Sequence, residues 1–454
     1  MNPRRSAAAV WLVWAVALAS ILIAIARDGR NIPFEEDWLM VGPMLGQEPD
    51  VPRWLWSQNS EHRLPLPRLV NLVLLRASGD FRSTMVFNVL ALALVAAAMI
   101  VTARSLRGGV TSPADAFFPL LLLHLGNWDN LVWGWQIQFV LPTALACVLL
   151  LIVVTDPEQH TRGVSIAGAL ALICLPLSGA NGLVLTPALA AWFAYTAWAR
   201  RRRDQSDHLT GSWIPGGAAL VAIVLCVIYF VGYESSPWNE PSPGLRAAVE
   251  TTLKFVALAV GPAAASSWLL FGGLMLLILL GCLFVLFAAR QRWSNQLRLA
   301  GFLAFFASFA VLAVAVGWGR AGRAAATGRM PTRYVLLAAP VLCAAYFTLL
   351  LYGRERLQRT GPAALAVLMA VLLPFNTHVG LQRREWFGTG MVAFERDLAS
   401  GALPTVLARR HHGFLLHWDE PLMVSSMRML RDSGIGPFTR IPREPDQHAP
   451  VSGE

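Results

Sequence analysis

The stretch "AAAVWLVWAVALASILIAIA" (residues 7–26) decides the class of the fold. Ser20 is its only polar residue, and about 20 apolar residues are what a helix needs to cross the hydrocarbon core of a bilayer. An open sheet is excluded there, because its unpaired backbone would face lipid. The sequence therefore predicts an all-α polytopic membrane protein with about 11 transmembrane helices, at 7–26, 83–103, 114–126, 131–154, 163–178, 182–199, 214–232, 268–289, 297–317, 335–352 and 361–378.

The composition agrees with this class. The 454 residues are 56% hydrophobic and 14% charged, whereas soluble domains carry about 25% charged residues. The net charge of +10 is almost entirely arginine, with Lys254 as the only lysine, and much of it lies in short loops. Loop arginines follow from the positive-inside rule, so no nucleic-acid partner is expected. The five cysteines fall in apolar runs and suggest neither a metal motif nor a disulfide framework.

The distribution of arginine predicts the orientation in a bacterial inner membrane. The first five residues, "MNPRR", precede an apolar run without a small-x-small cleavage site, so we expect a retained helix with a cytoplasmic N-terminus. Arginine-rich connections then lie in the cytoplasm, and the turns at 127–130 and 179–181, which lack basic residues, lie outside. An odd number of crossings leaves residues 379–454 as a small extracytoplasmic C-terminal domain after a transmembrane domain at 1–378.

Short amphipathic segments are expected outside the bundle. In the first outer loop, 27–82, "VPRWLW" (51–56) and the segment 66–76 have the pattern of helices lying on the membrane surface. The segment 245–262 is similar. In the tail, residues 417–434 predict a helix with Asp419 as its N-cap.

Two groups of ionisable residues fall in the first outer loop. "NIPFEEDWLM" (31–40) contains Glu35, Glu36 and Asp37, and a second group contains Glu61, His62 and Arg63. Asp129 lies in a short outer turn and should reach the same patch. Charges clustered close to a membrane are costly and mark function, although a solvated acidic loop is the alternative.

A third group breaks the topology rule. The predicted outer loop 318–334, "WGRAGRAAATGRMPTRY", holds Arg320, Arg323, Arg329 and Arg333 and no acid. Arginine-rich composition with snorkelling side chains is one explanation. An anion site is the other, because guanidinium groups match phosphate oxygens in a forked geometry. A carboxylate could then take a proton from an acceptor hydroxyl while the arginines stabilise a departing lipid phosphate.

These features resemble the membrane glycosyltransferases of the GT-C superfamily. The long first outer loop with "EED" after the first helix is similar to theirs, and Glu35-x-Asp37 fits their acid-x-acid pattern. The resemblance implies that Asp37 is the catalytic base, that Asp129 is a second acidic position, and that "TRY" (332–334) contacts the lipid phosphate. It also implies inverting transfer from a polyprenyl-phosphate sugar to a glycan, lipid or protein acceptor. The stretches "NSEHRLPLPRL", "NLVWGWQIQF" and "SGANGL" further resemble those of bacterial polytopic membrane proteins, a likeness that implies no activity.

The remaining site predictions follow from this scheme. Glu35 or Glu36 would orient the acceptor or a divalent cation, and the metal requirement stays open. The predicted substrate-binding residues are Glu61, His62, Arg63, Asp129, Gln136, Arg320, Arg323, Arg329, Arg333 and Tyr334. In the tail, His411, His412 and His417 could bind a metal, or could be surface and packing histidines. The alternatives are a transporter or flippase of lipid-linked glycans and a non-catalytic assembly protein. Ionisable residues at the outer rim, rather than deep in several spans, favour the enzyme.

Overall fold

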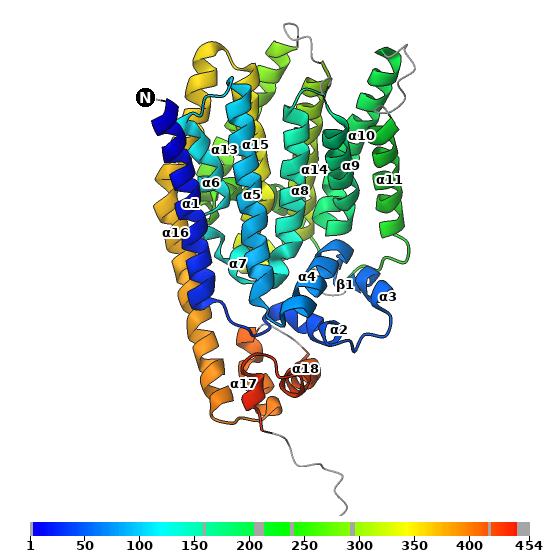
Figure 1. Ribbon diagram of the computed structural model, residues 1–454, viewed down its shortest axis with the longest axis vertical. Coiled ribbons are helices and arrows are strands. Elements are labelled where there is room, and N and C mark those ends of the chain that lie inside the picture. The colour runs from blue at the N-terminus through cyan, green and yellow to red at the C-terminus, as the bar shows by residue number, and fades with distance from the viewer. Residues whose placement is uncertain are drawn as a thin grey trace, which may run out of the picture.

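The computed structural model describes residues 3–157, 160–203, 213–236, 240–290, 296–415 and 419–442 (Figure 1). The long helices stand side by side in one bundle. The segment 29–81 lies at the same end as the tail helices α17 (Pro404–Leu415) and α18 (Glu420–Asp432), at the bottom of Figure 1. We call this the loop end.

Eight helices in the described residues are long and apolar enough to cross a membrane. They are α1 (Pro3–Asp28), α5 (Arg82–Leu106), α8 (Ile137–Val154), α10 (Ala180–Arg203), α13 (Trp268–Ala289), α14 (Gln296–Thr327), α15 (Val335–Tyr352) and α16 (Glu355–Ala399). The apolar helices α9 (Arg162–Cys174), which continues into η6 (Pro176–Ser178), and α11 (Trp213–Tyr229) are shorter. This is the architecture of an all-α membrane protein, but the expected count of about 11 crossings is not confirmed.

The predicted span 114–126 is broken into short pieces: η2 (Pro113–Ala116), α6 (Phe117–Leu122) and η3 (Leu125–Asn127), followed by α7 (Trp128–Val132) and η4 (Gly134–Gln136). The chain leaves the helical conformation at Leu123, with φ −119° and ψ 59°. The broken backbone packs against Gly380 of α16, where a Cβ atom would lie 2.0 Å from the Leu125 carbonyl oxygen. Irregular backbone among membrane helices is tolerated when it is buried in protein, as it is here.

The segment 29–81 folds as η1 (Glu35–Met40), α2 (Val41–Met44), α3 (Val51–Trp56), a hairpin of β1 (Gln58–Asn59) and β2 (His62–Arg63), and α4 (Pro65–Ser78). Asp50 caps α3 by accepting a hydrogen bond from the Arg53 amide, at 3.0 Å. Gly79 ends α4 at φ 64°, a conformation that glycine adopts readily. Helices are therefore present at 51–56 and 66–76 as predicted, and their position on a membrane surface stays a prediction.

The predicted arginine-rich loop 318–334 is mostly helix, which corrects the sequence analysis. α14 continues to Thr327 because alanine and arginine are strong helix formers, and Gly328 at φ 69° ends it. Only a short connection separates α14 from η9 (Thr332–Tyr334). α12 (Leu245–Ala257), in the segment 245–262, packs along α14 and leads through η7 (Leu258–Val260) and η8 (Pro262–Ser267) into α13.

The tail begins as an extension of the last apolar helix. α16 has 45 residues and runs through residue 378 without a break. After α17, the helix α18 starts as predicted: the Asp419 carboxylate accepts a hydrogen bond from the Leu422 amide at 2.9 Å. A short turn, η10 (Gly436–Arg440), ends the described tail. Met423, Met427 and Leu430 are buried and form the apolar face of α18, with Leu422 half-buried beside them.

The centre of the bundle is α15, which is almost entirely buried. Its position relative to α8 is fixed by the Thr143 hydroxyl, which donates to the Leu336 carbonyl oxygen at 3.0 Å. At the loop end of the same pair, the rings of Phe139 and Tyr334 meet edge to face, with centroids 5.3 Å apart. This packing holds Tyr334 and its neighbour Arg333 beside the first turns of α8.

Candidate functional site

A cavity of about 520 Å³ opens at the loop end between the segment 29–81 and helices α8 and α14. Carboxylates and arginines line it together, and we call it the acid–arginine cavity. Its lining residues are Glu36, Asn59, Ser60, Glu61, His62, Gln138, Phe139, Ser236, Glu240, Gly319, Arg320, Arg323, Thr327, Arg333 and Tyr334. The structure thus brings together most of the residues that the sequence analysis placed in one outer patch.

Glu36 and His62 present buried polar atoms to this cavity. Within the described residues, neither Glu36 Oε2 nor His62 Nδ1 has a hydrogen-bond partner. Burial raises the pKa of Glu36, although the nearby Arg333 opposes this. Burial lowers the pKa of His62 to about 4, so the imidazole is neutral at pH 7. A carboxyl group with a raised pKa and a neutral imidazole therefore line the cavity together.

Glu35 occupies a strained position. Its φ of 50° places a non-glycine residue in the left-handed region, which costs of order 1–3 kcal/mol and is found mainly at functional sites. Its Oε2 lies 3.8 Å from Arg333 Nη1. Burial and the adjacent Glu36 raise the pKa of Glu35 to about 8, with Arg333 acting in the opposite direction. The strained turn thus keeps two carboxyl groups close together beside one guanidinium.

Asp37, the predicted general base, points away from the cavity. Its side chain is buried, and its Oδ2 accepts a hydrogen bond from the Phe34 amide at 3.4 Å. Burial raises the pKa of Asp37 well above its usual range. The reason is local: the Asp37 carboxylate is directed to the Phe34 amide at the start of η1 rather than to the cavity. Only Glu36 of the three lines the acid–arginine cavity.

The arginines fall into paired and unpaired groups. Arg320 donates to the Tyr334 hydroxyl at 2.8 Å and to Glu61 Oε1 at 3.0 Å. Arg333 lies near Glu35 and over the Trp133 ring, 5.8 Å from its centroid. In the described part of the chain, Arg323 and Arg329 have no carboxylate partner, and both side chains are exposed. Two guanidinium groups are therefore free to receive an anion.

Asp129 lies near this group but is already engaged. The Thr332 hydroxyl donates to Asp129 Oδ2 at 2.6 Å, and Arg383 Nε donates to Asp129 Oδ1 at 3.0 Å. Arg383 is not among the predicted site residues, because it lies on α16 beyond the end of the predicted span 361–378. Arg383 and Arg384 follow the predicted outer end of the span 361–378, where the positive-inside rule expects few basic residues. This pair of arginines was the signal in the sequence that could have pointed to a site residue.

Four predicted substrate-binding residues do not line the acid–arginine cavity: Asp129 and Arg329 line the cavity next to it, and Arg63 and Gln136 line neither. Arg63 donates from its guanidinium to four backbone carbonyl groups, at 2.8–3.1 Å, so it ties the hairpin to the end of α11. These acceptors are Trp56, Tyr229, Val231 and Gly232. Gln136 is fully buried, and its neighbour Gln138 lines the cavity in its place. The sequence alone does not distinguish an arginine that binds substrate from one that donates to backbone carbonyl groups, because every residue carries such a carbonyl group.

A second cavity, of about 430 Å³, shares Arg323, Thr327 and Arg333 with the first. It also contains Asp129, Arg329 and Arg383. We call it the arginine cavity. It adjoins a third cavity, of about 700 Å³, with which it shares Arg329, Met330, Thr332 and Val379.

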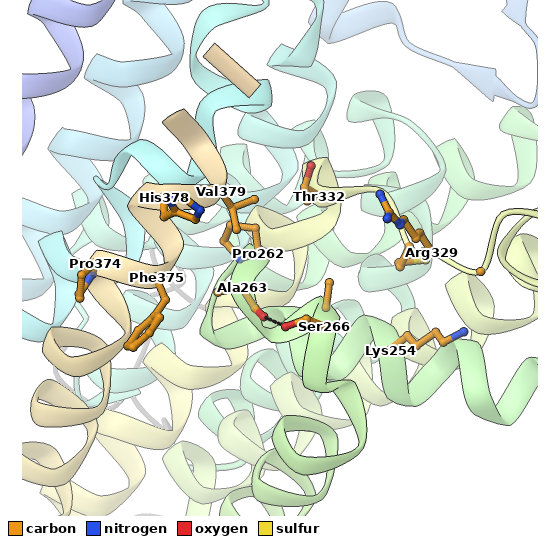
Figure 2. Close-up of a pocket in the computed structure, with 13 residues that line it drawn as sticks. Lys254, Pro262, Ala263, Ser266, Arg329, Thr332, Pro374, Phe375, His378 and Val379 are labelled. Carbon is orange, nitrogen blue, oxygen red and sulfur yellow. Dashed lines mark hydrogen bonds between the residues drawn. The ribbon is translucent and has the colours of Figure 1, made fainter. Parts of the chain in front are cut away.

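The third cavity is largely apolar, and Figure 2 shows its lining. Pro374, Phe375, His378 and Val379 come from α16, and Pro262, Ala263 and Ser266 come from η8. Lys254 and Arg329 add two basic side chains to the lining, across the cavity from α16 in Figure 2. Asn376 of α16 holds the two walls together: it donates to the Val260 carbonyl at 2.9 Å and accepts from the Ala263 amide at 3.0 Å. We call this the apolar cavity.

A metal centre is not evident in the part of the chain that the structure describes, where no group of three or more His, Cys, Asp or Glu side chains converges. In the tail, His411 Nε2 lies 2.9 Å from Asp397 Oδ2, and His412 is exposed. His417 lies outside the described residues.

No family model matches the chain, and no curated protein matches it. The assignment of a function therefore depends on the geometry and chemistry of the three cavities.

Proposed function

We propose that this chain is a membrane glycosyltransferase of the GT-C type, which moves a sugar from a polyprenyl-phosphate donor to a glycan, lipid or protein acceptor. One observation carries the proposal. The apolar, arginine and acid–arginine cavities adjoin one another along residues 323–334. Their order matches the order of groups in the donor: a hydrocarbon chain, a phosphate and a sugar.

The phosphate of such a donor fits the arginine cavity. Arg323 and Arg329 are not paired with a carboxylate among the described residues, and a phosphate oxygen is the acceptor that a guanidinium fork matches best. The hydrocarbon chain would lie between α16 and η8, against Phe375, Pro262 and Ala263. The sugar would then reach Glu36 and His62.

The reaction needs a base and a stabilised leaving group. Glu36 takes the proton of the acceptor hydroxyl, whose oxygen attacks the anomeric carbon. The bond between that carbon and the phosphate oxygen breaks, and the polyprenyl phosphate leaves with the bonding electron pair. Arg323, Arg329 and Arg333 stabilise the charge that develops on the phosphate. Attack from the side opposite the phosphate inverts the anomeric configuration.

In this scheme Glu36 replaces Asp37 as the base. Glu36 lines the acid–arginine cavity and has an unpartnered carboxyl oxygen among the described residues. Asp37 instead accepts the backbone hydrogen bond that shapes the turn. The proposed location is a bacterial inner membrane with the loop end outside, and a divalent cation is not required by the scheme.

The test uses a readout that does not depend on the identity of the sugar. Purified full-length protein in liposomes is supplied with lipid-linked sugars and acceptors extracted from the source cells, and released polyprenyl phosphate is measured by mass spectrometry. We expect release that depends on Glu36 and is accompanied by a glycosylated acceptor. Translocation of the intact donor across the liposome, without release, would instead identify a flippase.

A further inference from the structure

The residue before the acidic turn, Phe34, is enclosed by aromatic rings from other parts of the chain. Its centroid lies 5.6 Å from Trp133, 6.3 Å from Trp386, 5.2 Å from Phe387 and 5.7 Å from Phe414. Trp386 and Phe387 belong to α16, and Phe414 belongs to α17. We call these four rings the Phe34 cage. Each such pair contributes beyond simple burial, so the cage holds Phe34 firmly.

The tail also contacts the chain on both sides of Phe34, through α16 before it and through η10 after it. Arg384 of α16 donates to Asp28 Oδ2 at 2.8 Å, and Arg30 Nε lies 3.1 Å from Glu395 Oε1. After the turn, the rings of Trp38 and Phe438 meet edge to face at 6.1 Å. The strained residue Glu35 and the buried Asp37 therefore lie between contacts that the tail provides.

From these contacts we infer that α16 and α17 are positioning elements of the acidic turn, and that the Phe34 cage sets the direction in which Glu36 enters the acid–arginine cavity. Phe34 itself does not line that cavity, and neither do Trp386, Phe387 and Phe414. Trp133, the fourth ring, lines the arginine cavity and lies under Arg333. The three rings from the tail therefore act through the turn, and their consequence for catalysis rests on the proposed function. The effect of these rings on the geometry of the turn does not depend on the proposed function.

Two glycines of α16 offer a matched test. A Cβ atom on Gly390 would lie 2.0 Å from the Phe414 ring, whereas a Cβ atom on Gly388 would meet nothing within 4 Å. Both Gly→Ala changes raise the helix propensity of α16 to the same degree. Only Gly390→Ala displaces Phe414 from the cage.

The first measurement is hydrogen–deuterium exchange of full-length protein in nanodiscs. We expect Gly390→Ala to speed exchange in residues 34–40 by about tenfold, the order of effect of losing one or two aromatic pairs. Exchange in α15 should be unchanged. Gly388→Ala should match wild type in both regions. Phe34→Leu, which removes the enclosed ring itself, should reproduce the effect of Gly390→Ala.

The second measurement is polyprenyl phosphate release by the same variants. We expect Gly390→Ala to lower kcat about tenfold and to leave KM for the lipid donor within about twofold, because the displaced Phe414 ring lines none of the three cavities. Equal exchange in residues 34–40 for Gly390→Ala and Gly388→Ala would overturn the inference. If no variant, wild type included, releases polyprenyl phosphate, the proposed function fails while the exchange result still decides the role of the cage.

Discussion

Arg320 of α14 and Glu61 of the β-hairpin meet across the acid–arginine cavity, with 3.0 Å between Nη1 and Oε1. Their side chains are 23% and 20% exposed, so each group loses most of its water when the protein folds. Arg320 also donates to Tyr334, and one residue therefore joins the first loop, α14 and the start of α15. The pair closes one wall of the cavity.

The pair should be energetically coupled. In a cycle of Arg320→Ala, Glu61→Ala and the double variant, we expect a coupling energy of about 0.5–3 kcal/mol in the free energy of unfolding, because each single change leaves the other charge desolvated. The exposed pair Arg82–Asp80, at 2.6 Å, is the control and should couple by less than about 1 kcal/mol. Equal coupling in the two pairs would show that Arg320 and Glu61 are solvated.

Glu36 and Asp37 should differ in function. Glu36→Gln should lower the rate of polyprenyl phosphate release by about 10²–10⁴-fold, the usual effect of removing a general base. Asp37→Asn should have a much smaller effect on this rate, since an amide oxygen still accepts the Phe34 hydrogen bond. The liposome assay measures both, with donor binding followed in parallel. The reverse order of effects would return the role of base to Asp37.

The raised pKa of Glu35 gives two pH dependences. At pH 7 its carboxyl is largely protonated, so a hydrophobic carbodiimide should label it, and labelling should fall as the pH rises through about 8. Glu48, which is half-buried in the same loop, is the internal reference. Because the folded-state pKa exceeds the ordinary value of 4.5, the folded protein holds this proton more tightly than the unfolded chain. Its contribution to stability therefore falls between about pH 4.5 and 8, and Glu35→Gln should flatten that slope.

Arg329 should matter for the lipid phosphate. Arg329→Ala should weaken the binding of a polyprenyl phosphate by about 1.5–3 kcal/mol, the contribution of a hydrogen bond to a charged group. Arg329→Lys should recover only part of this affinity, since an ammonium group lacks the fork. Arg82→Ala changes an arginine outside all three cavities and should bind normally. Wild-type affinity in Arg329→Ala would exclude a phosphate at this position.

The orientation of the bundle can be measured with single cysteines in a cysteine-free background. Glu48→Cys and Gly388→Cys should react with a membrane-impermeant thiol reagent added outside, because the loop end is expected to lie there. Arg356→Cys, at the opposite end of α16, should react only after permeabilisation. Labelling of Gly388→Cys from the cytoplasmic side alone would contradict the proposed location of the site.

The sequence predicts the apolar helices well, because a helix that crosses a bilayer requires a run of about 20 apolar residues. Such a run is visible in the sequence itself. The Asp419 cap is predicted for a similar reason, since a cap depends on neighbours within three residues. The roles of the three acids are different. Whether Glu36 or Asp37 faces the cavity depends on the tight η1 turn, and that turn depends on Phe34 and its partners from α16 and α17.

Arg63 and the broken span show the same limit. The guanidinium of Arg63 donates to carbonyl groups of Tyr229 and Gly232, which are far away in the sequence. No pattern among the neighbours of Arg63 predicts these contacts. The run 114–126 is apolar enough to suggest a crossing, but its backbone is bent where it packs against Gly380 of α16. Tertiary contacts decided both outcomes.

The length of α16 has a mechanical consequence. At about 1.5 Å per residue its 45 residues span roughly 68 Å, more than twice the roughly 30 Å of a bilayer's hydrocarbon core. The helix that is apolar enough to cross the lipid is thus the same continuous rod, with Pro362 and Pro374 inside it, that carries Trp386 and Phe387 to the acidic turn. A thinner bilayer tilts such a rod, and a small tilt becomes a larger displacement at its far end. The position of the acidic turn should therefore depend on membrane thickness. We expect the rate of the proposed reaction to change with the length of the lipid chains.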